Sequence, residues 1–231
     1  IARSCTIPGM QQADNCELYA IAGRNIDKAE QFKEAFGFEK AYGSYKELLD
    51  DPEVEAVYIA LPNTLHYEWA VKAMQSGKHV LCEKPLAPSE QQVKELFDTA
   101  KENHVYLMEA FAYLHSPYIT TIRKEIEEGT IGEVRYIDSA FITSDYKKEN
   151  IRMRRETLGG CTYDLGVYST SLTLVMMNEE PENIKASAVF SEEQVDKLTS
   201  VVMEFSGGKK AAFTCGMTLA TDQDRRLDRL E

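Results

Sequence analysis

The sequence predicts an α/β fold: a parallel-sheet domain with helices on both faces, followed by an α+β domain with a large, mostly antiparallel open sheet. Up to residue 109, short apolar runs alternate with amphipathic stretches, as in strand–helix–strand units of a parallel sheet. After residue 129, long β-rich runs dominate, and Gly207-Gly208 between two of them is a hairpin signal. We therefore expect a boundary near residue 110.

The first half is expected to contain strands over 17–22, 55–61, 79–82 and 105–109. Residues 55–61 are almost all apolar, as in a strand buried on both faces of a sheet. Between the strands, Ser44-x-x-Glu47 and Ser89-x-x-Gln92 are helix-capping patterns, and Gly77 ends the helix that follows 55–61. A further helix is expected over 27–36. The buried stripe expected after Ser89 is Val93, Leu96, Phe97 and Ala100.

The second half is expected to begin with a helix over 117–128 and a turn at Gly129. A second helix is expected over 164–177. The tail 222–231 is dense in charge and has no obvious partner strand, so we expect it either at the surface or as the start of a missing segment. The β-rich runs of the open sheet cover 133–143, 183–191, 199–205 and 209–217.

The composition limits the partners and the compartment. The 231 residues carry 26 basic and 38 acidic side chains, a net charge of −12, which repels nucleic acid and anionic membrane surfaces. The longest apolar runs, such as 56–62, are too short to cross a bilayer, and no secretory signal is visible. The five cysteines are odd in number and never paired as C-x-x-C. We therefore expect no metal, no disulfides and a cytoplasmic protein.

Polar residues follow the points where the expected parallel strands end, which is where ligands bind in doubly wound sheets. Arg24 either binds an adenosine 2′-phosphate at this edge or is a solvated loop residue. Asn63 and His66 are candidates for contacts with a ligand. The alternatives are that Asn63 or Thr64 caps the following helix and that His66 is an ordinary residue of its first turn. Glu83-Lys84-Pro85 directly follows an apolar strand, and a lysine at the edge of a sheet favours a functional role.

A second group of candidate residues lies further along the chain. Gly159 and Gly160 lead into a helix on which Asp164 and Tyr168 are four apart and share one face. The alternatives are a helix N-cap for Asp164 and a core aromatic for Tyr168. Cys82 could act as a nucleophile, although its position at the end of an apolar strand favours a small buried side chain.

Three motifs together resemble the glucose–fructose oxidoreductase/inositol dehydrogenase (Gfo/Idh/MocA) family in order and spacing. They are E-K-P at 83–85, P-N-x-x-H at 62–66 and G-G-x-x-x-D-x-G-x-Y at 159–168. The resemblance spans essentially the whole chain. Tyr168, where inositol dehydrogenases carry histidine, looks like the dihydrodiol/D-xylose dehydrogenase branch. The resemblance implies a Rossmann-like dinucleotide-binding domain over 1–110 and a substrate-binding and oligomerisation domain over 111–231.

The resemblance implies an NADP-preferring enzyme, with NAD possible, that transfers hydride between nicotinamide and a sugar, diol or other cyclic alcohol or carbonyl. Lys84 and Tyr168 would be catalytic, with Tyr168 as the acid or base and the Lys84 ammonium stabilising its phenolate. Asp164 and Arg154 would join them around the substrate, and Pro85 would follow a cis peptide bond. A homodimer or tetramer through the open face of the C-terminal sheet is implied as well. The residues implied for the cofactor are Ile1, Ala2, Arg24, Leu61, Pro62, Asn63, His66, Glu83, Lys84 and Pro85.

The chain departs from the family pattern at three places. It starts where the family's first strand and G-x-G-x-x-A/G loop would end, and it stops before the family's last sheet strands, so we expect both ends to be missing here. The family's Y-R-x-H-P pattern is replaced at 113–117, which alters part of the substrate contacts. Two alternatives therefore stay open: a non-catalytic dinucleotide-binding sensor or regulatory subunit on the same scaffold, and a fragment with poor cofactor affinity of its own.

Overall fold

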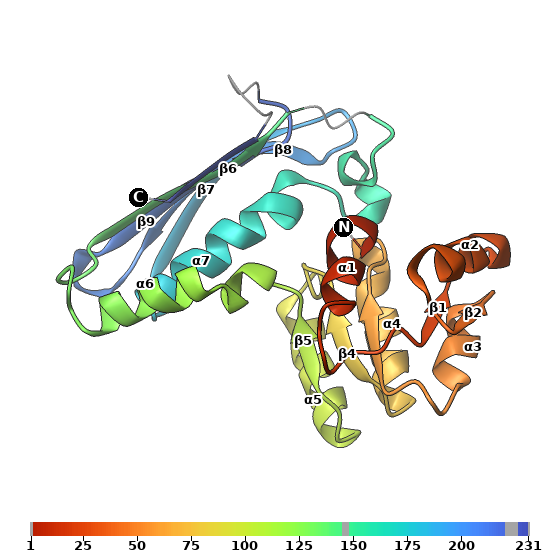
Figure 1. Ribbon diagram of the computed structural model, residues 1–231. Helices are drawn as coiled ribbons and strands as arrows, with labels where there is room; N and C mark the ends of the chain where they lie inside the picture. The colour runs from red at the N-terminus through yellow and green to blue at the C-terminus, as the bar shows by residue number, and fades with distance from the viewer. Residues whose placement is uncertain (1, 145–147, 220–225, 231) are drawn as a thin grey trace. The chain divides into compact units, whose positions relative to one another are not determined.

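The computed structural model describes residues 2–144, 148–219 and 226–230 (Figure 1). The chain separates into two compact units. The first unit comprises Ile1–Leu61 and Leu65–Glu109, and the second comprises Pro62–Thr64 and Ala110–Glu231.

The first unit contains the four parallel strands that the sequence predicts and one, β2, that it did not predict, arranged as two sheets. One sheet pairs β1 (Ala20–Ala22) with β2 (Lys40–Tyr42). The other has the order β3 (Ala56–Ile59), β4 (His79–Cys82) and β5 (Leu107–Glu109). The helices of this half are η1 (Ala2–Thr6), α1 (Ile7–Met10), α2 (Ile26–Phe36), α3 (Tyr45–Asp50), α4 (Asn63–Gln75) and α5 (Glu90–Glu102).

Polar side chains cap the helices of the first unit, as the sequence indicates. Ser44 accepts a hydrogen bond from Glu47 N at 3.2 Å, and Ser89 accepts one from Gln92 N at 3.3 Å. The Glu47 carboxylate accepts from Gly43 N at 3.1 Å, one residue earlier than the capping box would have it. These bonds fix where α3 and α5 begin.

One residue of the predicted stripe on α5 is exposed, and another, Val93, is only partly buried. Leu96 and Ala100 are buried as expected, but Phe97 is 52% exposed. Neighbouring residues on a helix point about 100° apart, so when Leu96 faces the core Phe97 is turned toward the side. The prediction was therefore wrong for Phe97. Cys82 is fully buried at the end of β4, as predicted, and burial raises the pKa of its thiol.

The single tryptophan of the chain, Trp69, lies on α4 in the first unit. Its ring meets the Tyr45 ring edge-on, with centroids 4.9 Å apart and planes at 77°. The ammonium of Lys72 lies 4.5 Å from the centroid of the Trp69 ring. Trp69 therefore joins α4 to α3 by an aromatic contact with a cation beside it.

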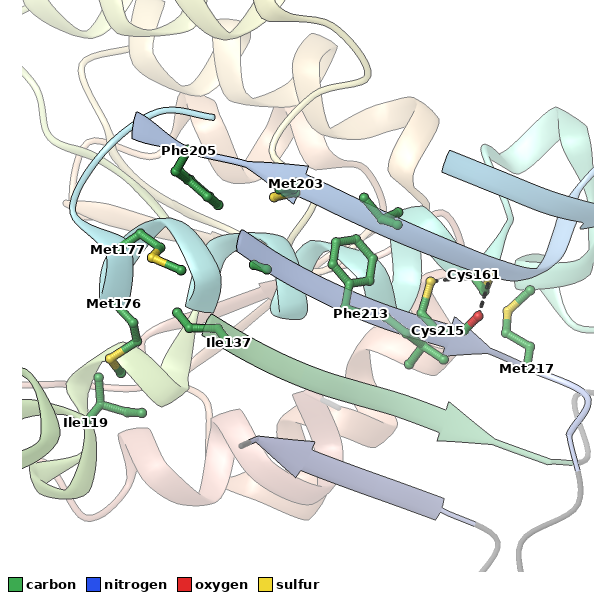
Figure 2. Packing of buried hydrophobic residues seen from close by; sticks show 13 residues of the cluster. Ile119, Ile137, Cys161, Met176, Met177, Met203, Phe205, Phe213, Cys215 and Met217 are labelled. Atoms are coloured by element: carbon green, nitrogen blue, oxygen red, sulfur yellow. Dashed lines mark hydrogen bonds between the residues drawn. The ribbon is translucent and has the colours of Figure 1, made fainter. Parts of the chain in front are cut away.

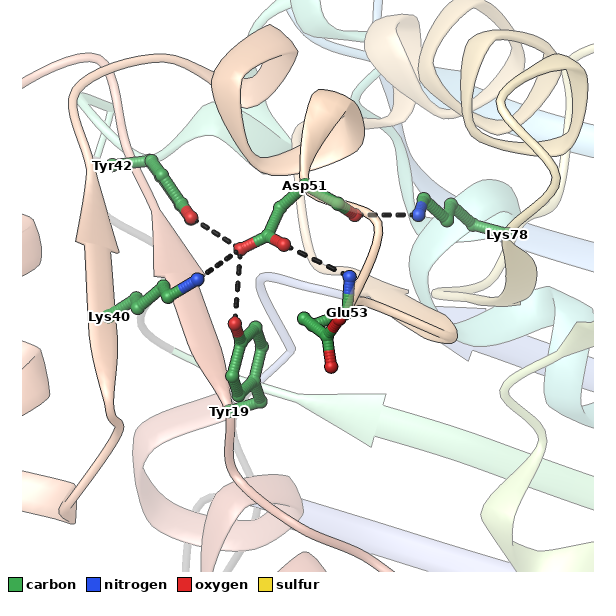
Figure 3. Close-up of polar contacts among 6 residues, drawn as sticks. All are labelled: Tyr19, Lys40, Tyr42, Asp51, Glu53 and Lys78. Atoms are coloured by element: carbon green, nitrogen blue, oxygen red, sulfur yellow. Dashed lines mark hydrogen bonds and ion pairs between the residues drawn. The ribbon is translucent and has the colours of Figure 1, made fainter.

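A cluster of polar side chains surrounds Asp51, which follows α3 (Figure 3). Its Oδ2 accepts hydrogen bonds from Tyr42 OH at 2.5 Å, Lys40 Nζ at 2.9 Å and Tyr19 OH at 3.3 Å. The hydrogen bond from Tyr42, followed by that from Lys40, lowers the pKa of the Asp51 carboxyl well below its usual range. The cluster ties β1 and β2 to the end of α3. Its residues are Tyr19, Lys40, Tyr42, Asp51, Glu53 and Lys78.

The second unit contains a five-stranded sheet in the order β10-β6-β9-β8-β7. The pair β6–β9 is parallel and the other pairs are antiparallel, so the sheet is mixed. Figure 1 shows α6 and α7 along one face of this sheet. The strands are β6 (Tyr136–Thr143), β7 (Asn183–Phe190), β8 (Asp196–Glu204), β9 (Lys210–Gly216) and β10 (Arg226–Leu230). The helical segments are η2 (Ala112–His115), α6 (Pro117–Glu127), η3 (Ile151–Met153), η4 (Arg155–Thr157), η5 (Thr162–Gly166), α7 (Val167–Met177) and η6 (Ser206–Gly208).

The tail is the clearest difference from the sequence-based expectation. Residues 226–230 form β10 and pair antiparallel with β6 from Arg226↔Thr143 to Leu230↔Ser139. The expectation that the tail has no partner strand was therefore wrong for these residues. Pairing satisfies the backbone donors and acceptors along one side of β6, and backbone bonding of this kind does not depend on side-chain polarity. Residues 222–225 and 231 lie outside the described part of the chain.

The core of the second unit lies between the sheet and α7 (Figure 2). Phe205, Phe213 and Met217 are almost completely buried. The Cys215 thiol donates to Cys161 Sγ at 3.6 Å, which joins β9 to the segment just before η5. This hydrogen bond and burial both raise the pKa of the Cys161 thiol. Both cysteines therefore behave as small buried side chains.

Candidate active site

Lys84 lies directly after β4 and is only 7% exposed. The Lys84–Pro85 peptide bond is cis, as predicted. The preceding residue, Glu83, accepts a short hydrogen bond from Tyr58 OH on β3, and Thr6 donates to the same phenol oxygen at 3.1 Å. Burial, and after it the hydrogen bond to Glu83, raises the pKa of Tyr58. The carboxyl end of β4 therefore carries a buried lysine in a turn whose neighbours are fixed.

His66 and Glu109 contact the turn that carries Lys84. Both ring nitrogens of His66, which is 1% exposed, lie 2.8 Å from carbonyl oxygens, Nδ1 from Pro85 O and Nε2 from Leu61 O. Glu109, the last residue of β5, accepts from Leu86 N at 2.8 Å. Burial raises the pKa of Glu109, while the bond from Leu86 and the charges of His66 and Lys84 oppose the shift. Glu109 was not identified from the sequence.

Arg24 follows β1 and is exposed. Asn25 next to it caps α2, its side-chain oxygen accepting from Lys28 N at 3.0 Å. No carboxylate of the described residues forms an ion pair with Arg24, so its guanidinium is available to an anion beside a helix N-terminus. Ala2 begins the short helical turn η1, and Ile1 lies outside the described residues.

The two glycines before η5 are explained by close packing. A Cβ on Gly159 would lie 2.4 Å from Arg152 O, and one on Gly160, whose φ is +121°, would lie 2.0 Å from Asp196 Oδ1. Gly160 N also donates to Arg152 O at 2.8 Å. The glycines therefore let the segment around Arg152 and the start of β8 approach the first turn of η5.

Asp164 is 9% exposed and pairs with Arg152, whose Nε lies 2.8 Å from Asp164 Oδ2. Arg154, which the resemblance implies for the substrate, is exposed and lies 3.8 Å from Glu156. The structure therefore joins Asp164 to Arg152 and not to Arg154. Asp164 lies within η5, whose N-cap position is Cys161, so Asp164 is not the N-cap residue of this helix.

Tyr168 lies on the first turn of α7 and is half-buried among aromatic rings. The centroid of its ring is 5.3 Å from that of Phe141, 5.7 Å from that of Phe111 and 6.1 Å from that of Tyr113. Tyr113 OH donates to Ser171 Oγ at 2.8 Å, which fixes that ring against α7. The aromatic rings orient Tyr168, and neither Phe111 nor Phe141 was identified from the sequence.

Residues 62–64 group with the second unit, while Leu61 belongs to the first. Within the second unit, Asn63 Nδ2 donates to Leu158 O at 2.9 Å, close to the Gly159 turn. Pro62 immediately precedes Asn63, the first residue of α4. Two side chains of the P-N-x-x-H motif therefore contact backbone carbonyl groups: Asn63 contacts that of Leu158, and His66 contacts those of Leu61 and Pro85.

Seven of the predicted site residues fall into two groups, each within one unit, and Arg24 and Arg154 belong to neither group. Lys84, Pro85, Glu83, His66 and Leu61 meet at the carboxyl ends of β3 and β4. In the second unit, Asp164 contacts Arg152 and Tyr168 contacts the aromatic rings. Arg152 was missed, although the two consecutive glycines after it signal a close backbone approach.

Two findings concern membranes and metals. None of the described helices combines the length and the apolar character that crossing a bilayer requires. Within residues 2–144, 148–219 and 226–230, no group of three or more histidine, cysteine or acidic side chains could hold a metal ion.

The first unit is of the Rossmann type, the class of fold that binds dinucleotides at the carboxyl ends of its strands. Residues 1–111 match the oxidoreductase family with an NAD-binding Rossmann fold, and residues 119–228 match the GFO/IDH/MocA C-terminal domain. The chain belongs to the GFO/IDH/MocA family of oxidoreductases, which confirms the predicted resemblance.

Three relatives illustrate the similarity. The chain is 39% identical over 224 residues to the oxidoreductase ORF334 of Rhizobium meliloti, covering 95% of this chain and 66% of that protein. It is 36% identical over 196 residues to trans-1,2-dihydrobenzene-1,2-diol dehydrogenase of Xenopus laevis, covering 84% of this chain and 59% of the relative. The crystal structure of KijD10, a 3-ketoreductase from Actinomadura kijaniata in complex with NADP and TDP-benzene, has a TM-score of 0.87 at 33% identity, covering 95% of this chain and 68% of KijD10. The chain therefore spans about two thirds or less of the length of the curated relatives.

Proposed function

We propose that the protein is an NADP-dependent oxidoreductase that interconverts an alcohol and a carbonyl on a sugar, diol or other cyclic compound. The observation that carries the proposal is Lys84, an ammonium 7% exposed in a fixed turn at the carboxyl end of a parallel strand. The similar proteins support the substrate class, since one is a diol dehydrogenase and another a 3-ketoreductase in complex with NADP.

The residues at the strand ends fit a phosphorylated dinucleotide. Arg24 offers an exposed guanidinium beside the N-terminus of α2, where a 2′-phosphate would gain a charge-assisted bidentate contact. Ala2, Leu61, Pro62, Asn63, Glu83 and Pro85 are proposed to border the same cofactor, with Lys84 nearest the nicotinamide. NADP, when bound, exchanges a hydride with the carbinol carbon of the substrate.

We assign the proton transfer to Tyr168. When the carbinol carbon gives up hydride, the hydroxyl proton moves to the Tyr168 oxygen, and in the reverse direction the phenol returns it. A free tyrosine has a pKa of about 10, and an adjacent cation favours the phenolate, which is the role proposed for Lys84. Asp164, oriented by Arg152 at 2.8 Å, is proposed to accept a substrate hydroxyl, and Arg154 to border the same substrate.

Substitution of Tyr168 by phenylalanine tests this assignment. The variant keeps the aromatic packing against Phe141 and Phe111 and removes only the hydroxyl. We expect kcat to fall by about 10²–10⁴-fold, followed through nicotinamide absorbance with a panel of aldoses and diols. An unchanged kcat would exclude Tyr168 as the acid–base group. Wild-type protein that binds NADP but turns over no member of the panel would instead favour a binding-only sensor.

The NADP preference is tested at Arg24. In Arg24→Asp the guanidinium is replaced by a carboxylate that repels a 2′-phosphate and can accept a 2′-hydroxyl. We expect the ratio of NADP to NAD affinity to fall by about tenfold or more, which is about 1.4 kcal/mol. A ratio within twofold of wild type would refute the proposed contact.

We also propose a homodimer or tetramer formed through the sheet face of the second unit that α6 and α7 leave open. Tyr136 and Val202 on that face are 55% and 42% exposed, and large apolar side chains gathered on an open sheet are typical of subunit interfaces. Val202→Glu should shift the sedimentation coefficient toward that of the monomer. An oligomer unchanged by Val202→Glu and by Tyr136→Glu would place the interface elsewhere.

The compartment proposed is the reducing cytoplasm, because all five cysteines are free thiols. Mass spectrometry of the protein after alkylation under native and denaturing conditions should find five reduced cysteines. Isolation of the protein with a disulfide would count against this assignment.

A further inference from the structure

His66 is more tightly engaged than an ordinary residue in the first turns of a helix. It is 1% exposed, and its two ring nitrogens each lie 2.8 Å from a backbone carbonyl oxygen, Leu61 O and Pro85 O. A carbonyl oxygen can only accept. A neutral imidazole has one N–H, so it can donate to one of these carbonyls, whereas an imidazolium donates to both.

His79 provides a contrast within the same unit. Its Nδ1 accepts a hydrogen bond from Tyr106 N at 2.9 Å, so this nitrogen carries no proton. His79 therefore meets a donor where His66 meets two acceptors. The two histidines should differ in the number of ring protons under the same conditions.

Charge and burial act on the His66 ring in opposite directions: the Glu109 carboxylate favours a second ring proton, whereas the Lys84 ammonium and the burial of the ring oppose it. Glu109 lies close enough to both His66 and Lys84 for their positive charges to act on its carboxyl group. The nearby Glu83 carboxylate is engaged by Tyr58 OH. Among these groups Glu109 is therefore the counter-charge available to the His66 ring, and it also accepts the Leu86 N–H at 2.8 Å.

We propose that His66 is an imidazolium that positions the Lys84 turn, donating to Leu61 O and Pro85 O, with Glu109 as its counter-charge. The ring ties the end of β3 to the residue after Lys84, and Glu109 ties the end of β5 to the residue after that. Three neighbouring strand ends thus hold one turn. His66 is a positioning residue in this scheme, and its ring nitrogens are used for the turn and not for the cofactor.

The protonation state is tested by ¹H–¹⁵N correlation spectra of the histidine rings in the ¹⁵N-labelled chain at about pH 7.5, where unperturbed histidine is largely neutral. We expect two ring N–H signals from His66 and one from His79. Signals are assigned by His79→Gln, His104→Gln and His115→Gln, which leave the turn intact. A single ring N–H on His66 would overturn the proposal.

Glu109→Gln isolates the counter-charge. The amide oxygen can still accept the Leu86 N–H, but the negative charge beside His66 and Lys84 is removed. We expect one His66 ring N–H signal to disappear at the same pH. Two retained signals would show that Glu109 is not the counter-charge. The wild-type spectrum tests the imidazolium even if this variant does not fold.

Positioning of Lys84 is tested by its reactivity toward reductive methylation, measured for each lysine by mass spectrometry. His66→Gln removes the ring contacts with Leu61 O and Pro85 O, so the turn should open more often and the methylation rate of Lys84 should rise about tenfold or more. The exposed Lys94 is the internal reference, and His79→Gln is the matched control. An unchanged Lys84 rate would refute the positioning role. The catalytic importance of Lys84 rests on the proposed function, whereas the spectra and the labelling rates need no turnover and therefore fail or succeed independently of it.

Discussion

Replacing Gly160 with alanine should disturb the start of the helix that carries Asp164 and Tyr168. The added Cβ would lie 2.0 Å from Asp196 Oδ1, and the residue would have to keep a φ of +121°. Asp196 cannot simply move away, because its Oδ2 accepts from Thr162 N at 2.8 Å and from Thr162 Oγ1 at 2.6 Å. The added methyl group therefore fits only if Asp196 loses its hydrogen bonds to Thr162, the first residue of η5, or if the backbone at Gly160 shifts.

The magnitude follows from the bonds at risk. A hydrogen bond to a charged group contributes about 1.5–3 kcal/mol, so loss of both bonds from Thr162 costs about 3–6 kcal/mol. An L-residue held at positive φ adds about 1–2 kcal/mol. Because the carboxylate regains some hydrogen bonds with water, we expect Gly160→Ala to lower the free energy of unfolding by about 3–5 kcal/mol.

Urea denaturation followed by circular dichroism measures this loss. The matched control is Gly207→Ala, where φ is +65° and no atom lies within 4 Å of the added Cβ, so only the backbone contribution of about 1–2 kcal/mol remains. In an Asp196→Ala background the contact with the Asp196 carboxylate is absent, so Gly160→Ala should cost less than in the wild-type background. The cost that remains should exceed that of Gly207→Ala, because a φ of +121° lies outside the left-handed region that includes +65°. Equal costs of Gly160→Ala and Gly207→Ala in the wild-type background would refute the packing argument.

Three further predictions concern other parts of the chain. Arg152→Gln should lower the free energy of unfolding by about 1–3 kcal/mol, because it removes the ion pair of a mostly buried carboxylate, whereas Arg154→Gln at an exposed pair should cost about 0.5 kcal/mol or less in the same urea assay. The depressed pKa of Asp51 stabilises the fold above about pH 4 and this contribution is lost as the pH falls further, so Asp51→Asn should flatten the acid side of a plot of Tm against pH. Leu96→Ala should cost about 2–5 kcal/mol and Phe97→Ala about 1 kcal/mol or less, and similar losses for both would contradict the observed face of α5.

Local patterns carried most of the fold prediction. The caps at Ser44 and Ser89 determine helix starts through bonds that span only three residues, so they can be seen in the sequence and are found in the structure. The strand β10 could not be seen in this way, because its pairing with β6 depends on backbone bonds between residues more than 80 positions apart. The charged sequence of the tail indicated a surface segment without a partner strand, but residues 226–230 pair with β6 through their backbone.

In the candidate site, too, local features could be predicted from the sequence, whereas contacts between distant residues could not. The spacing of Asp164 and Tyr168 predicts that they share a helical face, and that prediction needs no tertiary structure. Arg152 reaches Asp164 only because the chain folds back onto Gly159 and Gly160, so the choice between Arg152 and Arg154 required the structure. Glu109 belongs to a strand end whose neighbours are set by the order of β4 and β5 in the sheet, and one sequence does not reveal which strand ends lie side by side.

The position of Trp69 has a practical consequence for following the unfolding of each unit. Because it is the only tryptophan in the chain and lies in the first unit, its fluorescence follows the unfolding of that unit. The second unit contains tyrosines but no tryptophan, and excitation at long wavelength excites tryptophan and not tyrosine. A perturbation confined to the second unit should therefore change the ellipticity of the protein while leaving the tryptophan emission as it was.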